Sequence, residues 1–421
     1  SNSDIETIEK EIASLQEKLT KLKAEKKSST TENSSSSTND ASCSSSLPTN
    51  NKLRILSSQE CRALLAKKSE ELTLEERVLL VRSVGEECVM ESELEALLAN
   101  KPTLTIYDGM ECSGRMHIAQ GLFRALNVNK FTKAGGTFIF LLADLFAMLN
   151  NKIGGDLRKI RIAGEYMIEV WKACGMDMDK VKFIWSSDVI NADASEYWPL
   201  VMDIAKQFSV PRIIRCSQIM GRSEATSNMP ASQILYPCMQ AADVKFLNVD
   251  ICSLGMDQRK VNMLVREYYT KIKRKFKPVI VSHHMLMGLA EGQEKMSKSD
   301  PNSAIFMEDQ PHEVASKIKR AYCPPGQVEK NPCLDYMKHI VFNYVDEVLV
   351  KRKDSNGGNI VYKHYQDMED DYAAEKLHPG DLKATLRDQL NLLLEPVRQH
   401  FKTDQKARKL LGQVKKFRIT R

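Results

Sequence analysis

The sequence lacks the features that place a chain in a membrane or direct it out of the cell. No stretch of about 18 uninterrupted apolar residues occurs, which is roughly the length that a spanning helix needs. The N-terminal residues are polar and acidic, without the apolar segment of a secretory signal. We therefore expect a cytoplasmic protein that makes no membrane contact.

Patterns typical of metal sites and disulfide frameworks are missing as well. The ten cysteines occur singly, from Cys43 to Cys333, and no two of them form a CxxC pair. The adjacent His283 and His284 have no neighbouring cysteine that would complete a zinc set. The sequence predicts reduced thiols, no bound metal and no tightly bound cofactor.

A strong excess of one charge is also absent. The chain has 61 Lys and Arg against 55 Asp and Glu, a formal net charge of +6, which permits an RNA partner without requiring one. With 42% apolar and 28% charged residues, most of the chain is expected to be globular. Its 421 residues suffice for two or three domains.

The composition divides the chain into four parts. Residues 1–27 carry apolar side chains at spacings of three and four, which predicts a short coiled coil or a helix that docks on a protein partner: Ile5, Ile8, Ile12, Leu15, Leu19 and Leu22. Residues 28–50 are mostly Ser, Thr and Asn and predict a flexible linker. We assign 51–310 to a catalytic domain and 311–421 to a helical domain with a basic tail.

Strand and helix patterns alternate through the catalytic part. Thr73 and Glu76 form a capping box that opens a helix running to about Arg82. Strands are expected at 104–107, 137–143, 181–185 and 249–253, and helices at 117–126, 156–174 and 232–246. This order predicts an α/β fold with a doubly wound, Rossmann-like parallel sheet, whose ligands bind at the carboxyl ends of the strands.

The β patterns fade after about residue 310. Residues 311–323, 334–352 and 381–401 have amphipathic helical periodicity. The last twenty residues contain eight Lys or Arg and a single acidic residue, Asp404. A solvated basic face and a phosphate-binding surface are both consistent with this tail.

Two short motifs suit the binding of ATP. Met116–Gly121 reads MHIAQG and follows the first predicted strand, and Lys295–Ser299 reads KMSKS. A helix beginning at His117 would offer free backbone N–H groups to phosphate oxygens. A loop with two lysines and two serines can close over a pyrophosphate leaving group as its charge develops. The catalytic candidates are His117, Gln120, Lys295, Ser297, Lys298 and Ser299, and the pair predicts an adenylate-forming site.

One face of the predicted helix 232–246 suits an amino-acid pocket. Tyr236, Gln240 and Asp243 lie at i, i+4 and i+7, and Pro237 is tolerable if it falls in the first helical turn. A polar stripe is more often simply a solvated helix face. Here the stripe is flanked by apolar residues, which favours a lined pocket in which Asp243 accepts a hydrogen bond from a hydroxyl.

Residues from about 100 to 400 resemble the cytosolic tyrosyl-tRNA synthetases of the archaeal and eukaryotic type, a class I family. The resemblance rests on the two motifs above and on several further strings: Tyr107-Asp108-Gly109, residues 235–240, residues 255–260, residues 321–326 and residues 377–383. It implies a Rossmann-like catalytic domain with a dimerisation insertion, a helical anticodon-binding domain and a homodimer. It also implies L-tyrosine, ATP with Mg²⁺ and tyrosine tRNA as substrates.

The same resemblance assigns roles to individual residues. Tyr107 and Asp243 would bind the phenolic hydroxyl of tyrosine. Tyr236, Gln240 and Gln258 would surround its ammonium group. ATP would contact Gly109, His117, Gly255, Asp257, Lys295 and Lys298. His378 and Asp381 would recognise the first anticodon base.

The sequence departs from the family at two positions. Gln120 stands where many class I enzymes have a second histidine, and it cannot carry charge. Asn356 stands where relatives place an aromatic residue that stacks on the anticodon, and Asn offers no comparable ring. Tyr362 is a candidate to supply that contact instead.

Other functions remain compatible with parts of the pattern. A tryptophanyl-tRNA synthetase would use Asp243 to accept from an indole N–H, but Tyr107 matches an indole less well. A synthetase-derived RNA-binding protein without catalysis would not need an intact KMSKS loop. A small nucleotidyltransferase would leave the basic helical C-terminus unexplained.

Overall fold

The computed structural model describes residues 54–418, apart from 221–228, 297–299 and 301 and the side chains of Gln218 and Asn356. The predicted N-terminal helix, the linker and the KMSKS residues Ser297, Lys298 and Ser299 lie outside the described residues. All described residues belong to one compact unit, Lys52–Arg421. Among them, no helix has both the length and the apolar character required to cross a bilayer.

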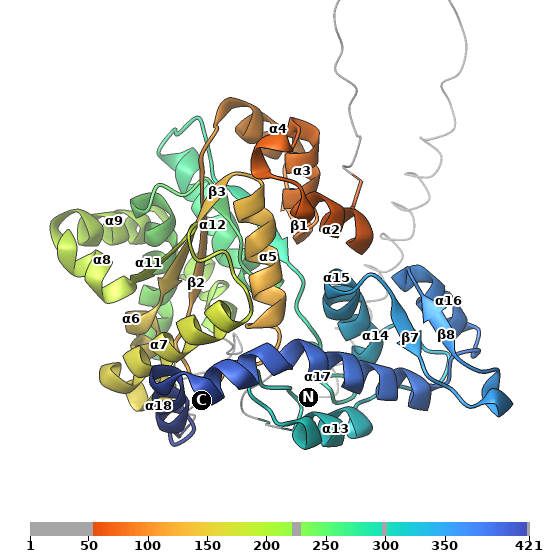
Figure 1. Cartoon of the computed structure of the whole chain (residues 1–421). Coiled ribbons are helices and arrows are strands. Elements are labelled where there is room, and N and C mark those ends of the chain that lie inside the picture. The colour runs from red at the N-terminus through yellow and green to blue at the C-terminus, as the bar shows by residue number, and fades with distance from the viewer. Residues whose placement is uncertain (1–53, 221–228, 297–299, 301, 419–421) are drawn as a thin grey trace, which may run out of the picture. The chain divides into compact units, whose positions relative to one another are not determined.

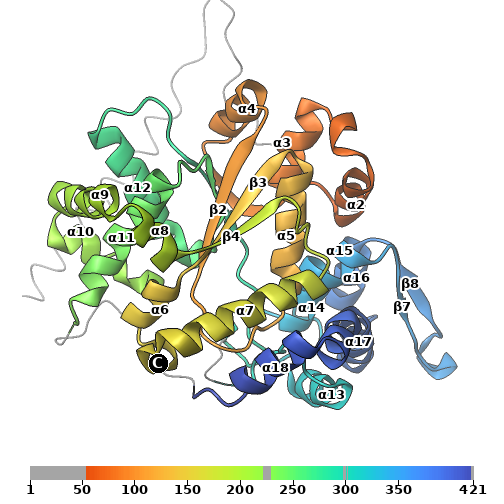
Figure 2. The same cartoon turned by 60° about the vertical axis from the view of Figure 1, so that its left-hand side comes forward.

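A six-stranded sheet forms the centre of this unit, in the order β1-β6-β5-β2-β3-β4 (Figures 1 and 2). Only β1 runs antiparallel to its neighbour β6, and the other pairs are parallel. The sheet confirms the predicted Rossmann-like, doubly wound class, with strands close to their predicted positions. The strand bounds are β1 Gly85–Val89, β2 Leu104–Met110, β3 Gly136–Leu142, β4 Val181–Trp185, β5 Ile251–Cys252 and β6 Val279–His283.

Successive residues of the strands enter different cores on the two faces of the sheet. Ile106 and Phe140 belong to a large apolar cluster that includes α5 and α7, whereas Tyr107 and Leu141 belong to a second cluster with α9, α11 and α12. This period of two is the expected alternation of a strand buried on both faces. The helices of this part are α2 Ser58–Ala66, α3 Leu74–Arg82, α4 Glu91–Asn100, α5 Leu122–Lys133, α6 Asp144–Leu149, α7 Leu157–Ala173, α8 Ser186–Ala192, α9 Ala194–Gln207, α10 Val210–Ile214, α11 Ser232–Phe246 and α12 Arg259–Lys271.

Several local predictions are confirmed, and one is wrong. Thr73 caps α3, and its capping box with Glu76 is present. The helix after the MHIAQG motif begins at Leu122, not at His117. Residues 116–118 instead pair with the segment after the KMSKS loop: the Ile118 amide donates to the Ile305 carbonyl at 2.9 Å, and the Met307 amide donates to the Met116 carbonyl at 2.9 Å. This extended pairing takes the backbone groups that a helical turn would have used.

The C-terminal part is mainly helical but contains a β-hairpin that the sequence analysis missed. Residues 334–352 were expected to form one helix, but the helical stretch ends at Tyr344, after a π-helical turn over Met337–Val341. A hairpin of β7 Val348–Val350 and β8 Ile360–Tyr362 follows. The helices are α13 Pro311–Arg320, α14 Pro332–Tyr336, α15 Phe342–Tyr344, α16 Tyr365–Ala373, α17 Pro379–Thr403 and α18 Gln405–Val414.

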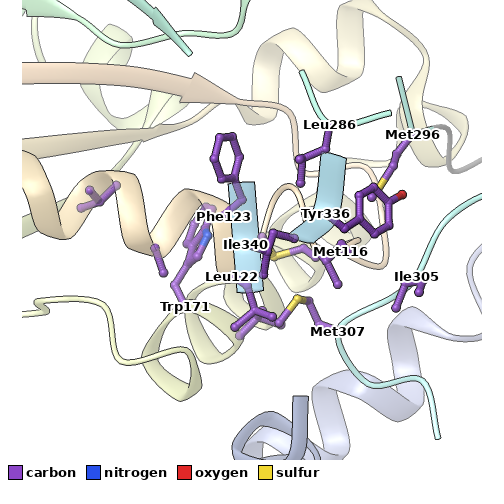
Figure 3. Packing of buried hydrophobic residues seen from close by; sticks show 14 of the residues in the cluster. Met116, Leu122, Phe123, Trp171, Leu286, Met296, Ile305, Met307, Tyr336 and Ile340 are labelled. Carbon is purple, nitrogen blue, oxygen red and sulfur yellow. The ribbon is translucent and has the colours of Figure 1, made fainter. Parts of the chain in front are cut away.

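Both sequence motifs contribute side chains to the large apolar cluster (Figure 3). Met116 and Met296 lie in this cluster with Met307, and Tyr336 and Ile340 join them from the C-terminal helices. Gly121 packs so closely on Met307 that a Cβ atom would lie 2.2 Å from its sulfur. The motifs are therefore held by the same packing that joins the sheet to the C-terminal helices.

Candidate active site

A cavity of about 280 Å³ opens at the carboxyl ends of the parallel strands. Every described residue that the sequence predicted for tyrosine or ATP lines this cavity: Tyr107, Gly109, His117, Gln120, Tyr236, Gln240, Asp243, Gly255, Asp257, Gln258 and Lys295. These residues come from β2, α11, the loops after β2 and β5, and the start of the KMSKS loop. The topology thus brings together residues that are up to 188 positions apart, from Tyr107 to Lys295.

One end of the cavity is built around Asp243. The Tyr197 hydroxyl donates to Asp243 Oδ1 at 2.8 Å, and Tyr107 interacts with the same carboxylate. Asp243 Oδ2 is buried and has no hydrogen-bond partner of normal geometry among the described residues. An acceptor left open in this way is matched by a ligand that brings its own O–H donor. Tyr197 was missed in the sequence, because nothing in its local pattern distinguishes it from a core tyrosine of α9.

Burial controls the ionisation of the Asp243 carboxyl group and of the Tyr107 phenol. Desolvation raises the pKa of Asp243 well above its usual value, and the hydrogen bonds from Tyr197 and Tyr107 oppose the shift. Desolvation and the nearby Asp243 carboxyl raise the pKa of Tyr107 as well. Tyr107 therefore stays protonated as a donor at physiological pH.

Gly109 has a steric role at this end. A Cβ atom at this position would lie 2.8 Å from the Tyr107 hydroxyl oxygen, because the two residues share one face of β2. Only glycine lets the phenol reach its position in the pocket. The family resemblance predicts a contact with ATP for Gly109, and this steric role is additional to it.

The predicted face of α11 is confirmed. Tyr236, Gln240 and Asp243 all lie on the cavity side, although Pro237 falls inside the helix and not in its first turn. Gln240 Nε2 donates to Gln258 Oε1 at 3.2 Å, and Gln258 in turn donates to the Ile219 carbonyl at 3.1 Å. These bonds fix the orientation of two amides whose remaining acceptor sites can face a ligand.

Glu111 adds a negative charge that the sequence analysis did not identify. Its Oε1 accepts from the Tyr236 hydroxyl at 2.9 Å and from Asn150 at 2.9 Å. Lys152 lies 3.8 Å from its Oε2. A carboxylate lining this side of the cavity is complementary to an ammonium group.

The other end of the cavity carries groups that suit a nucleotide. Lys295 Nζ donates to Asp257 Oδ2 at 3.0 Å, which links the start of the KMSKS loop to the turn after β5. Gln120 Oε1 is buried without a hydrogen-bond partner among the described residues, while the Gln120 carbonyl accepts from Trp171 Nε1 at 2.8 Å. Arg124 and Asp108 form a buried ion pair behind this wall.

An ion-pair cluster that no local sequence pattern indicates supports the two motifs. Arg115, directly before the MHIAQG motif, binds Glu308 at 2.5 Å and Asp309 at 2.9 Å. Lys317 of α13 binds Asp309 at 2.5 Å, and Arg398 of α17 donates to the Asp309 carbonyl at 2.7 Å. The cluster joins the two motifs to the C-terminal helices α13 and α17.

The residues predicted to read the anticodon lie on α17, outside the cavity. His378 is the N-cap of α17, and its Nδ1 accepts from the Gly380 amide at 3.0 Å. Asp381 lies in the first turn, so it does not cap the helix itself. A groove beside it is lined by His312, Lys319, Lys383 and Arg387, among others.

Tyr362 does not supply the aromatic contact with the anticodon that Asn356 lacks. The Tyr362 side chain is 2% exposed, and its hydroxyl donates to Asp371 Oδ2 at 3.0 Å. Its ring is therefore unavailable to a nucleotide base. The side chain of Asn356 lies outside the part of the chain that the structure describes.

Comparison with known proteins agrees with this geometry. Residues 99–395 match the family model for class I tRNA synthetases of the tryptophan and tyrosine type. The chain is 60% identical over 353 residues to the Arabidopsis thaliana protein named tyrosine–tRNA ligase 1, cytoplasmic, covering 84% of this chain and 91% of that protein. It is 56% identical to tyrosine–tRNA ligase 2, cytoplasmic, of the same plant, covering 90% of this chain and half of that longer protein.

Solved structures give the same result. A Leishmania major tyrosyl-tRNA synthetase in complex with tyrosinol has a TM-score of 0.78 and 50% identity, over 82% of this chain and 61% of that one. A Pyrococcus horikoshii tyrosyl-tRNA synthetase complexed with L-tyrosine has a TM-score of 0.76 and 34% identity, over 81% of this chain and all of the other. A Plasmodium falciparum tryptophanyl-tRNA synthetase, at 17% identity and a TM-score of 0.58, shares the fold alone.

Proposed function

The chain belongs to the class I tyrosyl-tRNA synthetases of the eukaryotic and archaeal type and is a tyrosine–tRNA ligase, and from this premise we propose how its residues divide the work. The enzyme activates L-tyrosine with ATP and transfers the tyrosyl group to the 3′ end of tyrosine tRNA. The observation that carries the proposal is the Asp243 carboxylate, which lines the cavity with one oxygen held by Tyr197 and the other buried without a hydrogen-bond partner of normal geometry among the described residues.

Tyrosine binds with its phenol against Asp243 and Tyr107. Asp243 Oδ2 accepts from the substrate hydroxyl, and Tyr107 can donate to the substrate hydroxyl oxygen or accept from that hydroxyl. Gln240, Gln258 and Tyr236 receive the ammonium group, with Glu111 supplying the opposite charge. A pocket built around a substrate hydroxyl strongly rejects the analogue that lacks it, and tyrosyl-tRNA synthetases are the standard example of this rule.

Asp243→Ala tests the assignment. The variant should lose most tyrosine-dependent exchange of pyrophosphate into ATP and should discriminate much less between tyrosine and phenylalanine. Tyr197→Phe should reduce the same ratio less, because it frees Oδ1 but retains the carboxylate. Exposed Asp188→Ala is the matched control. An unchanged tyrosine-to-phenylalanine ratio in Asp243→Ala would refute the placement of the phenol.

Adenylate formation requires positioning and charge stabilisation but no covalent enzyme intermediate. The tyrosine carboxylate attacks the α-phosphorus of ATP, the bond to the bridging oxygen breaks, and pyrophosphate leaves. Gly255 and Asp257 line the part of the cavity that receives the ribose and adenine of ATP. The family resemblance assigns Gly109 to the same part. His117, Gln120 and Lys295 face the phosphates, and Lys298, Ser297 and Ser299 close over the leaving group as its charge develops.

Lys298→Ala should slow exchange while leaving tyrosine affinity nearly unchanged, because the loop acts on charge that is present mainly in the transition state. Lys406→Ala, on the far helix α18, removes an exposed lysine as a control. A variant of Lys298 whose single defect is weaker tyrosine binding would contradict this role.

ATP enters as its Mg²⁺ complex. Mg²⁺ prefers oxygen ligands and retains several waters, so the phosphates and water can supply most of its coordination. Asp257 is the carboxylate on the nucleotide side that can approach the ion, and its bond to Lys295 would then exchange for a contact with the phosphates.

Tyrosine tRNA binds along the C-terminal helices. His378 and Asp381 read the first anticodon base at the start of α17. The adjacent groove supplies Lys319, Lys383 and Arg387 for backbone phosphates. The basic residues of the tail, which follow the other end of α17, can supply further phosphate contacts.

A second copy of the chain covers the exposed apolar residues of α9–α11. Met202 is 67% exposed, Val210 58% and Leu235 37%, on helices that pack together beside the cavity (Figure 2). Burial of such side chains favours a homodimer. Met202→Glu should shift the molar mass measured by light scattering from dimer toward monomer, and an unchanged mass would place the interface elsewhere.

The N-terminal heptad segment binds a protein partner, and the enzyme acts in the cytoplasm. Support for the location comes from the Arabidopsis relatives, both of which are named cytoplasmic. Support for the partner comes from the apolar seam within residues 5–22.

A further inference from the structure

A cluster of two histidines and a carboxylate lies where the sheet meets the C-terminal helices. His284 follows β6, and Asp335 and His339 lie on α14 and the π-helical turn after it. One ligand atom from each residue lies within 4.8 Å of those of the other two. Among the described residues, this is the one group of three or more His, Cys, Asp or Glu side chains with such convergence.

The three side chains converge on one oxygen. His284 Nε2 lies 2.8 Å from Asp335 Oδ1, and His339 Nε2 lies 3.6 Å from the same oxygen. The imidazole rings stack with centroids 4.0 Å apart at 15°, and it is the Nε2 atom of each ring that lies toward Asp335 Oδ1. Asp335 and His339 are four residues apart on one helix face, the spacing at which helices present paired metal ligands. The π-helical turn sets the position of His339, and such turns recur at functional sites.

Neighbouring groups form hydrogen bonds that orient the side chains of His284 and Asp335. His284 Nδ1 lies 3.1 Å from Glu86 Oε2, and a carboxylate at this nitrogen directs Nε2 toward a metal. Asp335 Oδ2 accepts from the Met287 amide at 3.0 Å, which leaves Oδ1 to face the imidazoles. The Tyr336 hydroxyl donates to the Met287 carbonyl at 2.6 Å and fixes the same segment.

We propose that His284, Asp335 and His339 bind a divalent transition-metal ion, for which Zn²⁺ is the best match. Two imidazole nitrogens and one carboxylate oxygen are a donor set of zinc and its neighbours, and Mg²⁺ would prefer oxygen ligands alone. Binding displaces the proton shared by His284 and Asp335, and a small opening of the ring stack directs both lone pairs to one ion. Water fills the fourth position.

The charges around the site permit a cation. Asp335 and Glu86 supply two carboxylates, while Lys130 and Lys338 lie near enough to His339 to act on it and oppose the ion. Sequence spacing alone predicted no zinc site here, because neither His283 nor His284 has a neighbouring cysteine. The partners Asp335 and His339 lie more than 50 residues further on and become visible only in the fold.

The ion would be structural. It would tie the segment that leads from His284 to Lys295 to the C-terminal helices, and so fix the base of the KMSKS loop. This role is separate from the Mg²⁺ that accompanies ATP, and it does not depend on the residue roles proposed above.

Metal binding to the untagged full chain tests the site directly. The protein is stripped with a chelator and titrated with Zn²⁺ by calorimetry, and with Co²⁺ by visible absorption, which reports a site of low symmetry with nitrogen and oxygen ligands. We expect one equivalent of tight sites and a rise in melting temperature with Zn²⁺. His339→Ala should weaken this binding by at least about 100-fold and abolish the cobalt spectrum, and Glu86→Gln should weaken it by about 10-fold.

His364→Ala is the matched control, because it removes an exposed histidine elsewhere in the C-terminal part. Circular dichroism and tyrosine-dependent pyrophosphate exchange establish that each variant is folded. Absence of zinc binding to the wild-type chain, or equal affinity in the wild type and a folded His339→Ala variant, would overturn the proposal.

Discussion

At the scale of the residue, burial makes the charged form of the Asp243 carboxyl group in the pocket unfavourable. Asp243 is 3% exposed, and one of its oxygens has no partner of normal geometry among the described residues. An unsatisfied buried polar group costs about 1–3 kcal/mol of stability. In the proposed binding mode the substrate phenol would remove this cost, and part of the tyrosine specificity would be stored as instability of the free enzyme.

Asp243→Asn should therefore stabilise the free enzyme while it impairs tyrosine recognition. Because burial raises the folded-state pKa of Asp243, the native state binds this proton more tightly than the unfolded state. The stability that this proton provides is fully present below the ordinary Asp pKa of about 3.9 and is lost as pH rises through the folded-state value. The advantage of the variant in the free energy of unfolding should grow from pH 4 upward, to about 1–3 kcal/mol.

Denaturant unfolding of wild type and variant across this pH range measures the difference. Asp388→Asn, at an exposed position, controls for the loss of a carboxylate as such. A constant difference between wild type and Asp243→Asn at all pH values would show that Asp243 has an ordinary pKa.

Cys323 provides a second test at this scale. A hydrogen bond from the Cys333 thiol, aided by Tyr372 and Asn331, lowers the pKa of Cys323 below its usual value against the opposing effect of burial. Its alkylation by iodoacetamide should have a midpoint below the pH of about 8.5 at which an ordinary cysteine ionises, because the thiolate is the nucleophile. Mass spectrometry of the modified peptide measures the rate.

Two comparisons make the thiol prediction specific. Burial raises the pKa of Cys88 to about 12, so its alkylation should still increase above pH 9. Cys333→Ala removes the main donor and should move the Cys323 midpoint upward. A Cys323 profile that follows that of Cys88 would contradict the prediction.

At the scale of the element, the sequence predicted those segments whose signals are local. The alternation of strands and the face of α11 were correct, because apolar periodicity and a polar stripe are properties of adjacent residues. The start of α5 was wrong, because Met116 and Ile118 pair with a strand-like segment almost 190 residues away. Pro237 lies within α11 for a similar reason: tertiary packing on both sides of the helix outweighs the lost hydrogen bond.

The N-terminus of α17 allows the roles of His378 and Asp381 to be separated. His378 accepts a capping bond, so His378→Ala should lower stability by about 0.5–2 kcal/mol besides any effect on tRNA. Asp381 lies in the first turn, where a carboxylate contributes about 0.3–1 kcal/mol through the helix dipole. Asp381→Ala should reduce charging of tyrosine tRNA by about 1–3 kcal/mol, as expected for a lost base contact.

Tyrosyl-adenylate formation should be unchanged in Asp381→Ala, since that step needs no tRNA. Asp388→Ala, two turns further along the same helix, serves as the control. A lower melting temperature with normal charging of tyrosine tRNA would leave Asp381 a purely structural residue.

At the scale of the whole molecule, the two catalytic motifs depend on contacts that no local pattern reveals. Arg115 holds Glu308 and Asp309, and Asp309 is bound in turn by Lys317 and Arg398 from the C-terminal helices. Buried charges are retained in a fold only when they are paired, so the five residues stabilise one arrangement together. Each of them would be taken for a solvated charge if read in sequence alone. This explains why the candidate pocket could be predicted and its support could not.

Removal of the N-terminal fifty residues should leave the catalytic activity and the stability of the rest of the chain nearly unchanged. The large apolar cluster extends from Val78 to Val414, and every described pocket residue lies between Tyr107 and Met296. We therefore expect the cavity and the core beneath it to form from these residues when residues 1–50 are removed. The truncated chain should exchange pyrophosphate into ATP at the wild-type rate and melt within a few degrees of the full chain.

The truncation should instead weaken the association of the chain with a protein partner of the N-terminal heptad segment. If the heptad seam docks on another protein, a full chain in which Leu15 and Leu19 are both replaced by Asp should lose that association to the same extent as the truncated chain. Such a variant should retain exchange activity, because every described residue that lines the pocket lies between Tyr107 and Met296. Loss of exchange in the truncated protein would show that the N-terminal residues take part in folding or catalysis, and the assignment of residues 28–50 as a flexible linker would be wrong.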